Sequence, residues 1–260
     1  HAIITALLSE DADHDITCAP GNAGIAASVP CVQITATDPS AAANLAVGLE
    51  VDLVVVGPEA PLVAGVADAI REAGIPVFGP DADAAALEGS KTFAKRIMDA
   101  AGVPTGRAVR AATLLDAETA LDEFGAPYVV KADGLAAGKG VIVTSDRDAA
   151  VEHASHWLAH GEVLIEEFLD GEEVSLFVLS DGHDVLPLSP AQDFKRLGNN
   201  DEGPNTGGMG AYSPLPWLAD QFGSERAFVD ECLENIALPT VRQLESEGTP
   251  FIGLLYCGLI

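Results

Sequence analysis

The N-terminal part of the chain alternates short apolar runs with an amphipathic segment. Residues 52–57 and 75–78 are short apolar runs of the kind found in buried parallel strands. Between them, apolar residues recur with a 3.6-residue spacing over residues 62–73, which predicts a helix that ends at Gly74. Strand, helix and strand at this spacing predict a right-handed βαβ unit. A further strand is expected over residues 15–19.

The pattern changes toward the middle of the chain. A helix is expected over residues 90–101, with Lys91 and Lys95 on a different face from its apolar residues. Beyond it, the expected elements are strands over residues 128–132, 141–144 and 163–168, a helix over 147–159, and an antiparallel hairpin around Asp181 and Gly182. The sequence therefore predicts an α/β protein, with a parallel-sheet domain over residues 1–80 and an α+β domain over residues 81–260.

The chain is strongly acidic. Its 260 residues include 13 lysines and arginines against 40 aspartates and glutamates, a formal net charge of −27 at pH 7, and 48% of its residues are hydrophobic. This composition predicts a globular protein whose charge argues against binding to nucleic acid or to a membrane surface. The apolar runs are far shorter than the ~20 residues of a membrane-spanning helix. Four scattered cysteines without a CxxC pair indicate reduced thiols and a cytoplasmic protein.

Lysine is rare in this chain. The only lysines are Lys91, Lys95, Lys131, Lys139 and Lys195. So few lysines beside so many acids suggest a halophilic-type surface adapted to concentrated salt, in which case the remaining lysines are candidates for a function. The alternative is that they pair with surface carboxylates.

Two of these lysines lie in a glycine-rich segment between two expected strands, KADGLAAGKG at residues 131–140. It is not a Walker A loop, because three residues rather than four separate Gly134 from Gly138, and Gly140 stands where serine or threonine would bind magnesium. Such a loop can still lay N–H groups over phosphates while lysines neutralise their charge. A simple glycine-rich hairpin would explain the glycines but not the two lysines.

Three further regions carry groups suited to ligands. Residues 164–173 combine an apolar strand end with carboxylates, which suits adenine and ribose, although solvated acids at a strand end are the alternative. Residues 192–196 place two cations ahead of the glycine loop 203–210, which suits a phosphate or carboxylate, although a surface loop would explain the glycines. Residues 20–24 and 57–59 are expected at the carboxyl edge of the parallel sheet, with ordinary turn chemistry as the alternative.

The histidines and two of the cysteines are interpreted structurally. His153, His156 and His160 share a helix face at a spacing that can bind metal. The apolar stripe of this helix lies elsewhere, so we expect these histidines to point toward solvent, and no metal site is predicted. Cys232 and Cys257 are expected to be buried or half-buried thiols.

Five segments occur in the order of a known family: GPEAPLV at residues 57–63, LEGSK at 87–91, KADGLAAGKG at 131–140, EEFLDGEE at 166–173 and GPNTGGMGAYSP at 203–214. Together they resemble the phosphoribosylamine–glycine ligases, or glycinamide ribonucleotide synthetases, of the ATP-grasp superfamily. The resemblance implies a pre-ATP-grasp domain and an ATP-grasp domain with a mobile lid over about residues 107–171. It also implies an enzyme of purine biosynthesis that joins glycine to 5-phosphoribosylamine through a glycyl phosphate, with ATP cleaved to ADP and phosphate.

The resemblance implies a role for individual residues. The ATP phosphates would be held by Lys91, Lys131 and Lys139, with Gly134, Gly138 and Gly140 in the lid loop. The adenine and ribose would be contacted by Glu166, Glu167, Phe168, Leu169 and Glu173. The two other substrates would be bound by Pro20, Gly21, Asn22, Gly57, Pro58, Glu59, Asp193, Lys195, Asn205, Thr206, Gly207, Gly208 and Met209. Catalysis would depend on Lys131, Lys139, Asp193 and Lys195.

The chain also departs from the family pattern. The family's first strand would precede His1, and its Mg²⁺ or Mn²⁺ ligands and a C-terminal domain would follow Ile260. We therefore expect residues 1–260 alone to be catalytically incomplete. Two alternatives stay open: another ATP-grasp carboxylate–amine ligase, and a nucleotide-binding module without ligase activity.

Overall fold

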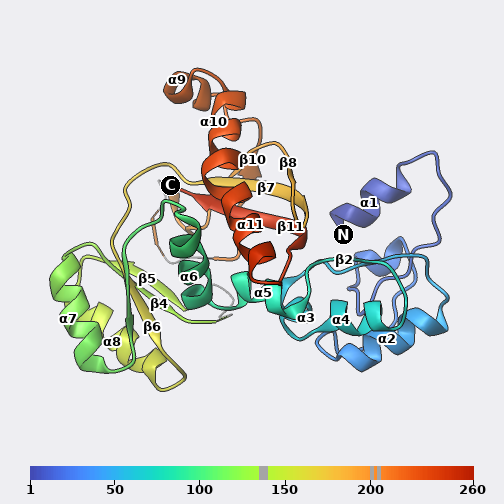
Figure 1. Cartoon of the computed structure of the whole chain (residues 1–260), viewed down its shortest axis with the longest axis horizontal. Coiled ribbons are helices and arrows are strands. Elements are labelled where there is room, and N and C mark those ends of the chain that lie inside the picture. Colours follow the sequence, from blue (N-terminus) through green and yellow to red (C-terminus); the bar gives the residue numbers. More distant parts are fainter. Residues whose placement is uncertain (135–139, 200–201, 204–205) are drawn as a thin grey trace. The chain divides into compact units, whose positions relative to one another are not determined.

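The computed structural model describes residues 1–134, 140–199, 202–203 and 206–260. Its contacts divide the chain into two units, His1–Ala82 and Asp83–Ile260, each of which is described by itself (Figure 1). Among the described residues, no helix is long and apolar enough to cross a membrane.

The unit His1–Ala82 contains the expected βαβ arrangement. Its elements are α1 (Ala2–Leu8), a 3-10 turn (Ile25–Ala27), α2 (Pro39–Gly48), β1 (Val54–Val55), α3 (Glu59–Val63), α4 (Val66–Glu72) and β2 (Val77–Phe78). β1 and β2 pair in parallel, with Val54 opposite Val77 and Val55 opposite Phe78. The parallel strand pair predicted from the apolar runs is therefore confirmed.

Three details of this unit were predicted wrongly. The helix expected over residues 62–73 is two helices, because Gly65 adopts a left-handed conformation (φ +85°) between α3 and α4. The first strand is short and not buried: Leu53 is 55% exposed and Val55 41%, since a two-stranded sheet covers few of its own side chains. The strand expected over residues 15–19 is a single parallel bridge between Cys18 and Cys31.

The unit Asp83–Ile260 begins with α5 (Ala82–Gly89) and α6 (Lys91–Ala101). A four-stranded antiparallel sheet follows, in the order β3–β6–β4–β5, from β3 (Ala108–Ala111), β4 (Tyr128–Ala132), β5 (Val141–Thr144) and β6 (Val163–Glu166). The helices α7 (Leu114–Phe124) and α8 (Arg147–Leu158) pack on this sheet around a core that includes Leu121, Val130 and Ile165. The expected elements are confirmed here, except that the last strand ends at Glu166 rather than at residue 168.

A second sheet has the order β11–β7–β8, all antiparallel, with β7 (Val174–Asp181), β8 (Val185–Pro187) and β11 (Ile252–Leu259). Its core includes Leu176 and Leu244 and is covered by α10 (Glu225–Cys232), a π-helical turn (Leu233–Ala237) and α11 (Leu238–Ser246). The remaining elements are β9 (Gln192–Asp193), β10 (Ala211–Tyr212) and α9 (Leu218–Phe222). The hairpin expected around Asp181 and Gly182 is the turn between β7 and β8.

Cys232 and Cys257 are buried in this core, as expected. Burial raises the pKa of the Cys232 thiol to about 11 and that of Cys257 to about 12. Both groups therefore remain protonated thiols at neutral pH.

Candidate functional site

A lysine and a glutamate meet on one face of the four-stranded sheet. In the register of β4 and β6, Lys131 lies opposite Leu164, so Glu166 is its diagonal neighbour on the same face. Val130 and Ile165, the alternate residues, pack in the core with α7 and α8, so Lys131 and Glu166 lie on the other face. The Lys131 Nζ donates a hydrogen bond of 2.7 Å to the Glu166 Oε2. The Glu166 side chain is only 10% exposed, so this ion pair is largely shielded from water.

Two lysines of α6 contact the same region. The Lys95 Nζ lies 3.8 Å from the Glu166 Oε1 and donates to the Thr105 Oγ1 (2.9 Å) and to the Gly106 carbonyl (2.7 Å). The Lys91 Nζ donates to the Gly134 carbonyl at 2.9 Å. Lys91, Lys95, Lys131 and Glu166 are called the lysine cluster below. It places three ammonium groups in one region, so it suits an anion that can contact more than one of them.

The protein environment disfavours the charged form of two of these lysines. Burial lowers the pKa of Lys91 and of Lys95 below the ordinary value of 10.5, and the neighbouring Lys131 lowers both further. Asp133 and Glu166 act in the opposite direction but do not cancel the effect. An anion placed beside these ammonium groups would therefore relieve their repulsion.

The residues that follow β4 contact the start of α6. The Asp133 carboxylate accepts hydrogen bonds from the Thr92 N–H (3.2 Å) and from the Ser90 hydroxyl (3.1 Å). Burial alone would raise the pKa of Asp133, but these hydrogen bonds outweigh it, so its pKa lies below 3.8. Asp133 is therefore ionised at neutral pH. The other described end of the glycine loop, Gly140, is buried, and its carbonyl accepts from the Ala132 N–H at 2.7 Å.

The segment predicted to contact adenine continues from β6. The Glu167 side chain accepts from both the backbone N–H (2.7 Å) and the Nε (2.8 Å) of Arg107. Phe168 and Leu169 are each 42% exposed. Glu167 thus ties β6 to the start of β3, while the two apolar side chains stay accessible.

A second polar group surrounds Lys195. The Lys195 Nζ donates to the Glu173 Oε2 at 2.7 Å and to the Asp193 Oδ1 at 3.3 Å. Partial burial lowers the pKa of Lys195, but Glu173, Tyr256 and Asp193 together raise it above 10.5. Lys195 therefore remains a cation at neutral pH.

The predicted glycine loop is joined to this group. The Lys195 carbonyl accepts from both the N–H (2.7 Å) and the hydroxyl (2.9 Å) of Thr206. The Met209 N–H donates to the Phe194 carbonyl at 2.7 Å, and the Gly208 N–H to the Thr206 hydroxyl at 3.0 Å. Gly207 lies between them and is exposed. The structure thus brings the 192–196 segment and residues 206–209 together in one polar group.

The other predicted substrate residues belong to the unit His1–Ala82. Pro20, Gly21 and Asn22 form a turn in which the Asn22 Oδ1 accepts from the Ile25 N–H at 3.0 Å. Gly57, Pro58 and Glu59 follow β1, and Glu59 is the first residue of α3; all three are exposed. Both segments have polar or backbone groups available to a ligand. Gly138, Lys139 and Asn205 lie outside the described residues.

The three histidines of α8 differ in their exposure. His156 and His160 are exposed, as expected, but the Nε2 of His153 is buried and without a hydrogen-bond partner in the described part of the chain, so the prediction was wrong for His153. Among the described residues, no group of three or more His, Cys, Asp or Glu side chains could hold a metal ion.

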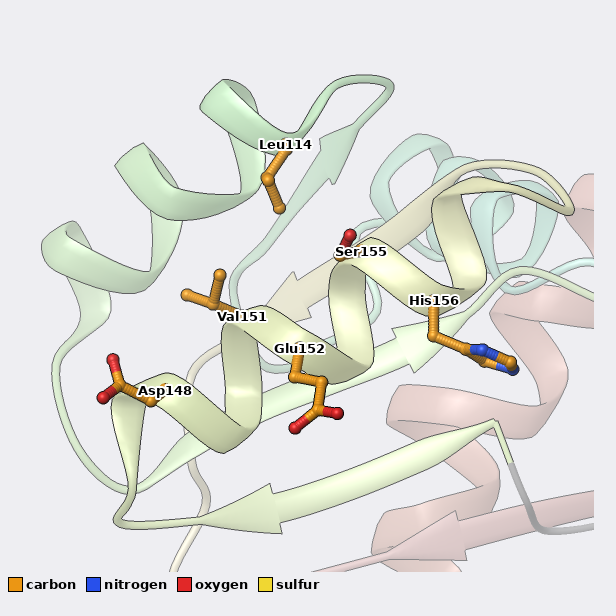
Figure 2. Close-up of a pocket in the computed structure, with 6 residues that line it drawn as sticks. All are labelled: Leu114, Asp148, Val151, Glu152, Ser155 and His156. Carbon is orange, nitrogen blue, oxygen red and sulfur yellow. The ribbon is translucent and has the colours of Figure 1, made fainter.

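A surface pocket lies elsewhere on the same unit. Its volume is about 550 Å³, and Figure 2 shows its lining, in which Asp148, Glu152 and His156 project from α8 beside Leu114 and Val151. None of the residues of the lysine cluster line it. The pocket is open and acidic, so we assign the candidate site to the lysine cluster instead, where the charges suit an anion.

Two residues of the cluster region were not among the predicted site residues. Lys95 was noticed as one of the rare lysines but was given no role, although its spacing of four residues from Lys91 puts both on one helix face. Asp133 was part of the glycine segment without a stated role. Its partner Ser90 is 43 residues away, so no local pattern indicates their contact.

Comparisons with known proteins agree over the whole chain. The N domain of phosphoribosylglycinamide synthetase matches residues 1–88, and the ATP-grasp (A) domain of the same family matches residues 89–260. The phosphoribosylamine–glycine ligase of Leifsonia xyli subsp. xyli (strain CTCB07) is 71% identical over 262 residues, covering 100% of this chain and 61% of the relative. The chain thus spans 61% of the length of that curated relative.

Solved structures give the same result. The crystal structure of phosphoribosylamine–glycine ligase from Thermotoga maritima has a TM-score of 0.75 at 30% identity, over 99% of this chain and 61% of that one. The biotin carboxylase domain of Hydrogenobacter thermophilus 2-oxoglutarate carboxylase, in complex with MgADP, ADP and bicarbonate, has a TM-score of 0.63 at 17% identity, over 92% of this chain and 58% of that one. The second likeness concerns the fold alone.

Proposed function

The chain belongs to the phosphoribosylglycinamide synthetase family, and from that membership we propose that it is part of an ATP-dependent, ADP-forming ligase of purine biosynthesis. The enzyme joins glycine to 5-phosphoribosylamine and gives glycinamide ribonucleotide, ADP and phosphate. The observation in the structure that carries this proposal is the lysine cluster, in which Lys95 and Lys131 lie 3.8 Å and 2.7 Å from Glu166 and Lys91 contacts the Gly134 carbonyl, in a chain with a net charge of −27. Four of the five family segments lie in or beside the described parts of the lysine cluster and of the polar group around Lys195. They are residues 87–91, 131–140, 166–173 and 203–214.

The reaction has two steps. A carboxylate oxygen of glycine attacks the γ-phosphorus of ATP, the bond to the β-phosphate oxygen breaks, and ADP leaves with that oxygen. The amine of phosphoribosylamine then attacks the carbonyl of glycyl phosphate and expels inorganic phosphate, and the amine loses a proton as the amide forms. Phosphoryl transfer needs in-line placement and positive charge around the transferring oxygens more than covalent help from the protein.

The lysine cluster supplies that charge. Lys91 and Lys131, with Lys139, hold the ATP phosphates, and the segment from Gly134 to Gly140 forms the lid loop. The Glu166–Lys131 bond of 2.7 Å means that the phosphates compete with a carboxylate for this ammonium group. When the Lys131 ammonium group binds a phosphate instead, Lys95, whose Nζ lies 3.8 Å from the Glu166 Oε1, remains as the ion-pair partner of Glu166.

The adenine occupies the apolar surface beside Phe168 and Leu169, and Glu173 accepts hydrogen bonds from the ribose. The exposure of the two apolar side chains supports this assignment. The match of residues 89–260 to the family's ATP-grasp domain supports ATP as the nucleotide. A divalent cation accompanies the nucleotide, and no step is assigned to it.

Glycine and phosphoribosylamine bind at the second polar group, where Asp193 and Lys195 act on the reacting groups and Thr206 to Met209 supply N–H donors. The resemblance also assigns Asn205, Pro20 to Asn22 and Gly57 to Glu59 to these two substrates. On this view residues 1–80 are the substrate-side domain, residues 81–260 the ATP-grasp domain, and residues 107–171 its lid, in a cytoplasmic enzyme.

The proposal is tested with the full-length gene product in concentrated KCl, with phosphoribosylamine generated in situ. ADP release is measured in the complete mixture and in mixtures without glycine or without the amine. The proposal requires turnover only when both are present. Release that needs neither, or ATP binding without turnover in any mixture, would instead support a nucleotide-binding module, and turnover with bicarbonate or formate in place of glycine would identify another ATP-grasp ligase.

The lowered pKa values of Lys91 and Lys95 predict that ADP binds more weakly at alkaline pH. In the free protein these lysines lose their protons at a lower pH than exposed lysines, whereas bound phosphates favour the ammonium form and raise the pKa again. ADP binding is therefore accompanied by proton uptake, and this uptake increases as the pH rises toward 10.5. Calorimetry of ADP binding from neutral pH up to pH 10.5, in buffers of different ionisation enthalpy, measures this uptake. Equal affinity and no proton uptake over this whole range would contradict the assignment of Lys91 to the phosphates.

A further inference from the structure

The end of β4 binds to the beginning of α6 through one carboxylate. The Asp133 Oδ1 accepts hydrogen bonds from the N–H groups of Thr92 (3.2 Å) and Gly134 (3.1 Å). The Asp133 Oδ2 accepts from the Ser90 hydroxyl at 3.1 Å. Asp133 belongs to the segment after β4, whereas Ser90 and Thr92 open α6, so this group of hydrogen bonds joins two elements distant in sequence.

The carboxylate is not needed to cap the helix. The Ser90 Oγ already accepts from the Phe93 N–H at 3.1 Å, as an N-cap residue does. Asp133 adds a full negative charge where α6 carries the positive end of its dipole and unpaired N–H groups. Three donors for one half-buried carboxylate make this a specific contact rather than a chance surface pair.

The contact also determines where two of the lysines lie. Gly134, whose N–H is held by Asp133, offers its carbonyl to the Lys91 Nζ at 2.9 Å. Lys131 stands two residues before Asp133 in β4. The position of α6 relative to β4 therefore sets the distance between the ammonium groups of Lys91 and Lys131.

We propose that Asp133 is a positioning residue of the nucleotide site: by binding the N-terminus of α6 it fixes the Lys91 ammonium group relative to that of Lys131. The inference rests on the proposed function, since it takes both lysines as ligands of the ATP phosphates. Asp133 itself carries the wrong charge to bind a phosphate and acts only through Lys91 and Gly134. In metal sites, residues that orient the ligands change affinity by about 10- to 100-fold when removed, and we expect an effect at the lower end of this range here.

The test uses Asp133→Ala in the full-length gene product, with the ADP dissociation constant and the KM values for ATP and glycine as readouts. We expect ADP to bind about 10-fold more weakly and the KM for ATP to rise in parallel, with the KM for glycine unchanged. Asp133→Asn, which keeps an acceptor oxygen but loses the charge, should fall between Asp133→Ala and the unchanged protein. A general loss of structure would move both KM values together.

Asp146 provides a matched control, because it precedes α8, which packs on the four-stranded sheet that contains β4. Its Oδ1 accepts from the N–H groups of Asp148 (2.9 Å) and Ala149 (3.3 Å) at the start of α8, so it is also a carboxylate at a helix N-terminus. Asp146→Ala should lower thermal stability and leave ADP affinity unchanged. Equal weakening of ADP binding by Asp133→Ala and Asp146→Ala would overturn the positioning role.

A second pair of variants decides the question if Asp133→Ala does not fold. Ser90→Ala removes one donor to Asp133, and Ser224→Ala removes the corresponding N-cap hydroxyl of α10, which accepts from the Ala227 N–H at 3.0 Å. Ser90→Ala should weaken ADP binding several-fold and Ser224→Ala should not. If the protein without substitutions does not bind ADP, the proposed function is refuted. If ADP binds equally well to that protein and to every folded variant, only the role of Asp133 is refuted.

Discussion

Replacing Lys131 with methionine is expected to lower kcat/KM for ATP by about 100-fold or more, which corresponds to about 2.7 kcal/mol at 1.36 kcal/mol per tenfold change. Methionine keeps most of the length and apolar stem of lysine but removes the ammonium group. That group lies 2.7 Å from Glu166 on the face of the sheet turned away from α7 and α8. In the proposed reaction it supplies positive charge to phosphate oxygens, and no other group of β4 can replace it.

Arg110→Met is the control for this prediction. Arg110 lies on β3 of the same sheet and its Nη2 donates to the Glu162 Oε1 at 2.6 Å, but its side chain is 58% exposed. An exposed ion pair of this kind contributes about 0 to 1 kcal/mol, so the variant should keep nearly the full rate. Steady-state kinetics of the full-length gene product measure both. A Lys131→Met enzyme that keeps more than about a tenth of kcat/KM would show that Lys131 is not a phosphate ligand.

Glu166→Gln is expected to destabilise the unit Asp83–Ile260 by about 2 kcal/mol, and the double variant Lys131→Met/Glu166→Gln is expected to regain about half of this loss. Breaking a fully buried ion pair costs about 3 to 5 kcal/mol because one charge is left uncompensated. The value is reduced here because Lys131 and Lys95 remain 30% and 20% exposed. Replacing Lys131 as well removes the uncompensated cation, so the double variant is expected to be more stable than Glu166→Gln alone.

Urea unfolding followed by tryptophan fluorescence measures this effect. Both tryptophans, Trp157 and Trp217, lie in the unit Asp83–Ile260, so the signal follows the unit that contains the substitutions. Glu162→Gln, which removes the partner of the exposed Arg110, is the matched control and should cost less than about 0.5 kcal/mol. A double variant less stable than Glu166→Gln alone would contradict an electrostatic origin of the loss.

Local periodicity was sufficient to predict the strands that carry the site. Residues 128–132 were predicted as a strand because of their short apolar run between turn residues, and β4 has these bounds. The rarity of lysine indicated Lys91 and Lys131 as candidates, and the structure places both in the lysine cluster. In each case the signal is local or compositional, so a single sequence contains it.

The contacts between these elements could not be predicted in the same way. β6 is inserted between β3 and β4, so the pairing of Lys131 with Glu166 depends on a strand order that no local pattern encodes. The contact of Asp133 with Ser90 likewise depends on where α6 lies relative to the sheet. In the N-terminal unit, the valine-rich run at residues 52–57 predicts a buried strand, whereas β1 pairs with β2 in a two-stranded sheet of the described residues and Val55 is exposed. Burial is a property of the tertiary fold rather than of the run itself.

The measurement that tests the central claim most directly is an isotope transfer with the full-length gene product. Glycine labelled with heavy oxygen in its carboxylate is turned over with ATP and phosphoribosylamine, and the inorganic phosphate is examined by mass spectrometry. Because the glycine oxygen that attacks the γ-phosphorus leaves with the phosphate, each phosphate should carry one labelled oxygen, and the other should remain in the amide. Unlabelled phosphate formed together with the amide product would contradict an acyl phosphate intermediate and with it the proposed role of the lysine cluster.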